Sequence, residues 1–220
     1  MAEANQNNPN GVAWSGCFGA GSYLFFRENE RAEMLAVRTL ELSEKHQMWQ
    51  IAEYARCYLG WARAWLGRPS ESVALIRQAI AGLAAMGTHD DGCTLALAQS
   101  QALSGAVGDA LETIEPVLQL NRPDNIIRPE AFRWRGELQT KQGRREPAES
   151  DFRTALALAR SMEAKAYELR AAMSLARLLR DTGRCDEAHT MLVEIYNWFT
   201  EGFDIADLKE AKALLDELAI

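Results

Sequence analysis

The feature that most constrains this 220-residue chain is a short phrase that recurs along it at near-constant spacing. Each copy has a glycine in a polar turn, a small residue five positions later, and apolar residues four and seven positions beyond that. The glycines recur at a nearly constant interval and are Gly67, Gly105, Gly143 and Gly183. One further interval back from Gly67 lands on Asn29, which predicts a degenerate fifth copy. A fixed period of this length indicates a repeat architecture in which similar units stack on one another.

Each turn lies between two segments with the pattern of an amphipathic helix. Before Gly67, apolar residues recur at three- and four-residue spacing over 51–66. After it, Pro69 suits the first turn of a helix that runs to Gly87. The small residue after each turn glycine marks the point where the two helices cross closely. The same pattern predicts further antiparallel helix pairs over 92–104 with 107–120, 129–142 with 145–160, and 165–182 with 184–200. The sequence therefore predicts an all-α fold of about five helix pairs.

The two ends of the chain differ from the repeats. Residues 1–11 are polar and have no helical pattern, so we expect a disordered segment there and repeats over 12–203. An open stack of repeats exposes the apolar face of its last pair, which requires a cap with a polar outer side. Apolar residues form one stripe over 205–218, so 204–220 is predicted to be a capping helix, with Asp204 at its N-terminus. We expect it to pack on the 184–200 helix through Leu208, Leu215, Trp198 and Phe203.

These features resemble the tetratricopeptide repeat. The family has a small residue in its first helix seven positions before the turn glycine, and here this position holds Gly60, Ala98, Gly136 and Ala176. The period here is longer than is usual in the family, which implies longer helices or linkers. The resemblance implies a right-handed solenoid whose first helices line a concave groove. It also implies a function as a scaffold that binds a protein or peptide segment.

A second resemblance is strongest over 129–218. This stretch is similar to the C-terminal helical-repeat region of large bacterial proteins that join a cyclase or DNA-binding regulator domain to an ATPase module. The segment 60–68 and the RGEL segment that begins at Arg135 look similar to that family as well. Nothing in the chain matches the cyclase or ATPase motifs, so neither activity carries over. The resemblance implies a cyclase or ATPase domain as a possible partner, and a small-molecule-sensing regulatory domain as the alternative function.

Aromatic residues on one predicted first helix are the first candidate for a binding surface. Tyr54, Tyr58, Trp61 and Trp65 fall at i, i+4, i+7 and i+11, so they form one helical stripe. Such a stripe is either the core between helices, which we favour, or a wall of the groove with Trp61 or Trp65 exposed. In tetratricopeptide co-chaperones, Lys and Asn at set first-helix positions hold a peptide carboxylate. The matching positions here are Cys57, Trp61, Leu95, Gln99, Arg133, Glu137, Met173 and Arg177, which do not support that specificity.

Arginines on the last two first helices are the second candidate. If they face the groove, their guanidinium groups are able to grip carboxylates as bidentate donors. The favoured interpretation is a solvated or salt-bridged face, neutralised by Glu130, Glu137, Glu168 and Asp181. The arginines in question are Arg133, Arg170, Arg177 and Arg180. The full candidate groove set is Tyr54, Trp61, Trp65, Gln99, Arg133, Glu137, Arg170 and Arg177.

Composition and motif searches argue against several other functions. The chain has 24 basic and 31 acidic residues and no basic patch in its sequence. We therefore expect little electrostatic attraction for the phosphate backbone of a nucleic acid. No Ser–His–Asp or Cys–His pairing is apparent, so we expect no enzyme activity. The glycine-rich segment 16–22 lacks the lysine of a phosphate loop, so the sequence favours a helix of small residues there.

The remaining expectations concern metals, cofactors and location. The four cysteines and three histidines lack the close spacing of a zinc site, so no metal and no cofactor are expected. The sequence shows neither a secretory signal nor a membrane span. We therefore expect a cytoplasmic protein with buried, reduced thiols.

Overall fold

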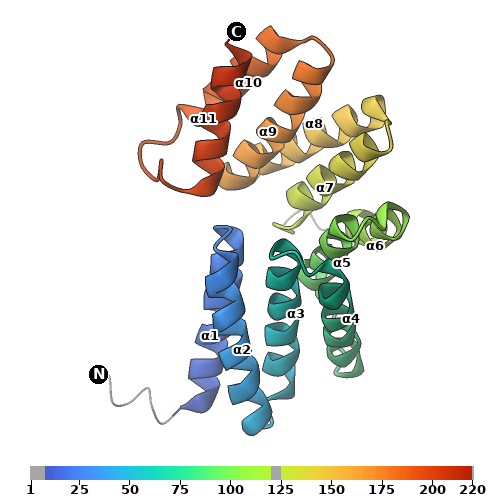
Figure 1. Ribbon diagram of the computed structural model, residues 1–220, viewed down its shortest axis with the longest axis vertical. Helices are drawn as coiled ribbons and strands as arrows, with labels where there is room; N and C mark the ends of the chain where they lie inside the picture. The colour runs from blue at the N-terminus through green and yellow to red at the C-terminus, as the bar shows by residue number, and fades with distance from the viewer. Residues whose placement is uncertain (1–7, 120–124, 220) are drawn as a thin grey trace. The chain divides into compact units, whose positions relative to one another are not determined.

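A computed structural model describes residues 8–119 and 125–219, and this part of the chain consists of α-helices with no strand (Figure 1). The all-α prediction is confirmed. Two compact units divide the chain: unit 1, Met1–Thr113, and unit 2, Ile114–Ile220. The helices are α1 (Pro9–Phe25), α2 (Asn29–Lys45), α3 (Trp49–Trp65), α4 (Pro69–Ala85), α5 (Asp91–Leu103), α6 (Val107–Gln119), α7 (Arg128–Lys141), α8 (Arg145–Ser161), α9 (Lys165–Asp181), α10 (Cys185–Tyr196) and α11 (Ala206–Leu218).

Each helix pair is joined by a short turn that ends the first helix in the same way. At Gly67, with φ of +82°, the Arg68 N–H donates to the Arg63 carbonyl at 2.9 Å, and the Gly67 N–H donates to the Ala64 carbonyl at 3.3 Å. This is the Schellman motif, which satisfies carbonyls that the helix end leaves without partners. Glycine adopts the left-handed conformation at little steric cost. The recurrent glycine is therefore a requirement of the turn.

The register of the first repeat differs from the sequence prediction. The left-handed residue that joins α1 and α2 is Arg27, with φ of +64°, and not Asn29. The prediction failed because an arginine occupies the position that is glycine in the later turns, and the repeat is slightly longer there. In the correct register, the packed residues of α2 are Ala32, Ala36 and Thr39, all 3% exposed or less.

Small residues allow the paired helices to approach closely. The predicted crossing positions Ser72, Ala110, Ala148 and Ala188 are all fully buried. A Cβ atom added at Gly136 would lie 2.5 Å from the Phe152 ring, and one added at Gly16 would lie 2.1 Å from Thr39 Oγ1. Gly16 lies within α1, so the segment 16–22 is part of a small-residue helix, as the sequence indicated, and not a phosphate loop.

The N-terminal boundary moves toward the start of the chain. We expected a disordered segment up to residue 11, but α1 begins at Pro9, and the Asn8 side chain caps it by accepting the Gly11 N–H at 3.1 Å. Asparagine at the N-cap and proline at the first helical position are strong start signals. The rest of the expected disordered segment, residues 1–7, lies outside the described residues.

The C-terminal helix α11 packs on both α9 and α10, side by side with them in Figure 1. Leu208 and Leu215 are buried as expected, at 1% and 7% exposure. The expected packing of Trp198 and Phe203 is wrong, because these side chains are 57% and 46% exposed. The reason is that α10 ends at Tyr196, so both aromatic residues lie in the linker to α11. The Asp204 cap is also wrong: the N-cap position is Ile205, which makes no side-chain capping bond.

Three of the four cysteines lie in the core of unit 1. Cys17, Cys57 and Cys93 are 1% to 2% exposed, Cys185 of unit 2 is half-buried, and all four are free thiols. Among the described residues, no helix is long and apolar enough to cross a membrane.

Candidate functional site: the first-helix faces

The first helices of successive pairs lie next to each other within each unit. In unit 1, α1 packs on α3 and α3 on α5; in unit 2, α7 packs on α9 and α9 on α11. Residues at the same distance from the turn therefore face their counterparts in the next helix. Thirteen residues before the turn stand Trp14, Tyr54, Gly92, Glu130 and Arg170. Six residues before it stand Gly21, Trp61, Gln99, Glu137 and Arg177.

In unit 1, we define the aromatic face as Trp14, Tyr54 and Trp61 at these positions, together with Phe18 of α1 and Trp65 of α3. The Trp14 ring stacks on Phe18 with centroids 5.8 Å apart, and it also contacts Tyr54 of α3 at 5.9 Å. Phe18 is 69% exposed and Trp65 is 40% exposed, while the other three are half-buried. Part of the aromatic surface is thus covered by neighbouring helices, and part of it faces outward.

Gln99 holds the indole of Trp61. The Trp61 Nε1–H donates to Gln99 Oε1 at 2.7 Å, and Gln99 is only 2% exposed. The hydrogen bond links α3 to α5 at equivalent positions of their repeats. The structure therefore brings Trp61 and Gln99 together, with the glutamine as a buried support for the tryptophan.

No member of the aromatic face is a charged residue, and the Asp90 carboxylate lies beside Tyr54. No Asp, Glu, Lys or Arg occurs in α1. The charged residues of α3 pair toward the second helices: Arg56 binds Glu44 of α2, and Arg63 binds Glu33 of α2 and Glu71 of α4. Burial, with a contribution from the Asp90 carboxylate, raises the pKa of Tyr54 to about 12, so its phenol is neutral at physiological pH.

In unit 2, we define the charged face as Glu130, Glu137, Arg170 and Arg177 at these positions, together with Arg133 of α7. Arg133 donates to Glu130 at 2.6 and 2.9 Å and lies 3.4 Å from Glu137. Glu137 also accepts a hydrogen bond of 2.6 Å from the Ser174 hydroxyl of α9. Burial alone would raise the pKa of Glu130, but the charge and hydrogen bonds of Arg133 hold it below its usual value.

The remaining arginines pair with α11. Arg170 Nε donates to Asp207 at 2.7 Å, and an Arg177 amino group donates to Glu210 at 2.6 Å. The salt-bridged interpretation therefore describes these side chains, although Asp207, Glu210 and the Glu217 partner of Arg180 were not expected. The expected partner Glu168 binds Arg160 and Lys165 instead. Sequence reasoning missed Asp207 and Glu210 because it treated α11 only as a cover. Asp207 follows Arg170 by close to one repeat period, which signals that α11 takes the place of a further first helix.

Trp14 and Phe18 are further residues that the sequence analysis missed. They precede Tyr54 and Tyr58 by about one repeat period, which relates them to the aromatic stripe of α3. This signal was hidden because Asn29 gave the wrong register for the first repeat. The candidate site thus extends to α1.

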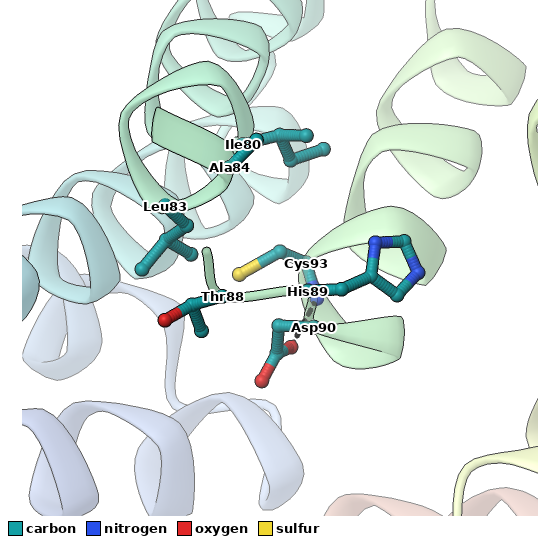
Figure 2. Close-up of a pocket in the computed structure, with 7 residues that line it drawn as sticks. All are labelled: Ile80, Leu83, Ala84, Thr88, His89, Asp90 and Cys93. Atoms are coloured by element: carbon teal, nitrogen blue, oxygen red, sulfur yellow. Dashed lines mark hydrogen bonds between the residues drawn. The ribbon is translucent and has the colours of Figure 1, made fainter. Parts of the chain in front are cut away.

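A small cavity lies at the start of α5 (Figure 2). Its volume of about 20 Å³ holds roughly one water molecule, which is too small for a metabolite. Asp90 Oδ1 accepts the Cys93 N–H at 2.8 Å as the helix cap, and the contact with Cys57, together with burial, raises the pKa of the Cys93 thiol. A protonated thiol is a weak nucleophile. The cavity is lined by Ile80, Leu83, Ala84, Thr88, His89, Asp90 and Cys93.

Comparison with known proteins identifies the fold. No protein-family model and no curated protein match this sequence. A thermophilic TPR protein from Thermus thermophilus has a similar structure, with a TM-score of 0.69 and 18% identity over 94% of this chain and 100% of that chain. The chain has the tetratricopeptide-repeat fold.

Two further solved structures agree with this assignment. The Pseudomonas aeruginosa pilF protein matches with a TM-score of 0.61 and 14% identity, over 96% of this chain and 90% of that chain. A signal transduction ATPase with a tetratricopeptide-repeat sensor, from Pyrococcus horikoshii, matches with a TM-score of 0.67 and 15% identity. That match covers 97% of this chain but only 33% of the ATPase protein. At these identities, the similarity establishes the fold alone.

Proposed function

We propose that this protein is a non-catalytic scaffold that binds a protein or peptide segment on its first-helix surface. Tetratricopeptide repeats are a helical-repeat architecture, and extended surfaces of such repeats serve for binding. The aromatic face of unit 1 is the principal contact surface in this proposal. It includes Tyr54, Trp61 and Trp65 from the predicted groove set, and adds Trp14 and Phe18.

The observation that carries the proposal is the exposure of large aromatic side chains on the first helices of two successive repeats. Phe18 of α1 and Trp65 of α3 leave 69% and 40% of their surfaces uncovered. Exposed apolar patches mark interaction sites, and aromatic residues dominate binding energy at interfaces. Trp61 is held in place by Gln99, so less side-chain entropy is lost when a ligand binds.

The charged face has a secondary role in the proposal. Arg133 is already satisfied by Glu130 and Glu137, which leaves it little capacity for a ligand carboxylate. Arg177 and Glu210 are 35% and 40% exposed and form the part of this face that solvent and a partner reach most readily. We assign Arg133, Glu137 and Arg170 to support of the fold, and Arg177 to the accessible part of the charged face.

The partner class follows in part from resemblance. A cyclase or ATPase domain remains a candidate partner, because the sequence resembles repeat regions attached to such domains. Among the described residues, the cavity at α5 gives a small-molecule sensor no specific support, since it holds about one water molecule. Buried free thiols are consistent with a reducing, cytoplasmic location.

A display experiment tests the scaffold function. A random peptide library is selected on the full chain, and selected peptides are measured against the Phe18→Ala/Trp65→Ala variant. Trp49→Ala is a matched control, since Trp49 lies on α3, is 56% exposed and is outside the aromatic face. Peptides that bind the wild type and the control but lose affinity for the double variant support the proposal. Failure to select any peptide, or equal binding to all three proteins, would overturn it.

A further inference from the structure

We propose that two copies of this protein associate through α1, with the uncovered side of one α1 packed against the same side of the other. This side consists of Val12, Ser15, Phe18, Gly19 and Ser22, and we term it the stacking face. The inference goes beyond the proposed function and does not depend on it, because Ser15 and Ser22, which test it, lie outside the aromatic face.

The residues of α3 that are equivalent to the stacking face are covered by the preceding helix pair. The left-handed residues that end the two helices, Arg27 and Gly67, relate α1 to α3. Leu59 packs with Ala20 of α1 and Ala36 of α2, and Ala62 packs with Leu24 of α1 and Ala32 of α2. The equivalent residues in α3 are Ala52, Ala55, Tyr58, Leu59 and Ala62, of which Tyr58 is half-buried and the others are 4% exposed or less.

The next first helix, α5, uses the same side in the same way. Cys93, Leu97 and Ser100 are its equivalents of Ala55, Leu59 and Ala62, and they are 8% exposed or less. Ser100 accepts a hydrogen bond of 2.7 Å from Ser72 of α4, the preceding second helix. In both later repeats of unit 1, this side of the first helix is therefore an interface with another helix pair.

On α1 the same positions are open. Val12 and Phe18 are 42% and 69% exposed, Ser15 and Ser22 are also exposed, and Gly19 is half-buried. Stacking in α3 leaves Tyr58 only half-buried, so association through α1 is expected to cover part of Phe18 and leave part of the ring accessible. The stacking face thus has the residue types of a covered surface without the cover.

The last helix shows how an end that stays exposed is built. Terminal repeats need a polar outer side, and α11 has one, since its exposed residues include Lys209, Lys212 and Asp216. If α11 of another copy packed on α1, these charges would lose hydration against a helix that offers no opposite charge. Packing of α1 on α11 is therefore disfavoured.

The absence of charge makes α1 complementary to itself. A two-fold symmetric contact places one face against the same face, so any like charges on it repel. Among the helices of the described residues, α1 alone contains no Asp, Glu, Lys or Arg. The chain has a net charge of −7, so α1 is the surface on which two copies approach with least repulsion. These observations favour a second α1 as the occupant.

The size of the face sets the expected strength. A helix of 17 residues is about 25 Å long, and one side of it offers less than the roughly 800 Å² that each partner buries in a standard interface. We therefore expect a reversible dimer with a dissociation constant in the micromolar range.

Sedimentation equilibrium of the full chain between roughly 1 and 200 μM tests the inference. The average mass should rise from that of one chain toward that of two and no further. In the Ser15→Arg/Ser22→Arg variant, positive charges oppose each other across the contact, which should weaken the dimer roughly a hundredfold. Both serines are exposed in the single chain, so this variant should melt like the wild type at concentrations where both are monomeric.

A charge swap identifies which faces meet. The Ser15→Asp/Ser22→Asp variant should also be monomeric, but an equimolar mixture with the arginine variant should recover dimers, because opposite charges then meet. This recovery requires that α1 faces α1. The matched control is Ser150→Arg/Ser161→Arg, which changes two exposed serines of α8 and should leave the dissociation constant within about twofold.

Four results would overturn the inference. They are a wild type that stays monomeric over the whole range, an arginine variant that dimerises as well as the control, a mixture that stays monomeric, and species larger than a dimer. The last result would indicate open head-to-tail stacking of copies.

Discussion

The two units place different chemistry on equivalent positions of one repeat. Where α3 of unit 1 has Tyr54 and Trp61, unit 2 has Glu130 and Glu137 in α7 and Arg170 and Arg177 in α9. The crossing positions between paired helices, in contrast, are small in both units. Packing within each helix pair therefore requires small residues at the crossing positions, whereas residue types on the first-helix face are free to vary. The fold does not itself specify function.

The two faces also differ in how far their side chains are satisfied by contacts within the protein. On the charged face, Arg133 is paired with Glu130 and Glu137, and the inner arginines of α9 bind α11. On the aromatic face, Phe18 and Trp65 keep much of their surface exposed. A charged side chain that is already paired gains little from a ligand, whereas exposed ring surface gains by being covered. This difference is why the proposed site lies in unit 1.

Removal of residues 204–220 should have the largest effect on the comparison. It uncovers the surface that Leu208, Leu214 and Leu215 bury, and each such leucine contributes about 1.5–3 kcal/mol. It also leaves Arg170 without Asp207. We expect unit 2 to melt at a markedly lower temperature or to aggregate, while amide hydrogen exchange in unit 1 stays the same. A truncated protein with unchanged melting would show that α11 is dispensable.

Glu130→Gln should weaken unit 2 by a smaller amount. Glu130 is 8% exposed and binds Arg133 through two hydrogen bonds, so its neutralisation leaves a buried guanidinium with Glu137 as its remaining carboxylate. Loss of one partner of a buried pair costs about 3 kcal/mol. We expect the free energy of unfolding of Glu130→Gln, measured by urea denaturation, to fall by about that amount. Glu217→Gln is the control, because its pair with Arg180 is largely exposed and contributes less than about 1 kcal/mol. Similar losses in both variants would contradict a structural role of the charged face.

Much of the fold could be predicted from the sequence because its signals are local. Apolar periodicity and turn glycines placed the later helices, from α5 to α9, within one or two residues of their observed bounds. The first repeat was misplaced by two residues because Arg27 adopts the left-handed conformation without the usual glycine. That error concealed Trp14 and Phe18.

The candidate site was harder to predict because its contacts are long-range. The stripe of Tyr54, Trp61 and Trp65 was visible as a helical pattern, but its exposure depends on α1 and α5. The partners of Arg170 depend on where α11 packs, and periodicity within one helix carries no information about its neighbour. Composition of the first helices indicated which chemistry is present, but not which charges neutralise each other.

Trp61→Phe tests the aromatic face with an intermediate effect on stability. The change removes the N–H that donates to Gln99 Oε1 and leaves a buried amide oxygen without that donor. We expect a loss of about 1–3 kcal/mol in urea denaturation. In the Trp61→Phe/Gln99→Leu double variant, much of this loss should return, because both polar groups are gone. If the double variant is as unstable as the sum of the single ones, the hydrogen bond is not what holds the indole.

The smallest expected effect is a difference between the two units in how their stability depends on pH. It is seen only at acid or alkaline pH. In unit 2, the pKa of Glu130 is held down by Arg133 against the effect of burial, and hydrogen bonds from arginines lower the pKa of Glu187 and Glu149. In unit 1, the same holds for Glu33. A depressed carboxyl pKa stabilises the folded state above the unfolded value of about 4.3, and this contribution is lost as the pH falls through the folded value. Acid should therefore weaken unit 2 first.

Alkali should weaken the units in the opposite order. In unit 1, burial raises the pKa of Tyr54 and of Cys17 to about 12 and also raises that of Tyr58, while the Cys57 contact, together with burial, raises the pKa of Cys93. In unit 2, Tyr167 shows this shift, also to about 12. A raised pKa of a thiol or phenol stabilises the folded state below the unfolded values, about 8.5 and 10, and this stability is lost as the pH rises toward 12. Arginines stay charged throughout that range, so the charged face keeps its ion pairs.

Amide hydrogen exchange followed by mass spectrometry, corrected for the pH dependence of intrinsic exchange, resolves the two units separately. If unit 1 loses protection before unit 2 at acid pH, and unit 2 before unit 1 at alkaline pH, the two faces do not govern the stability of their units.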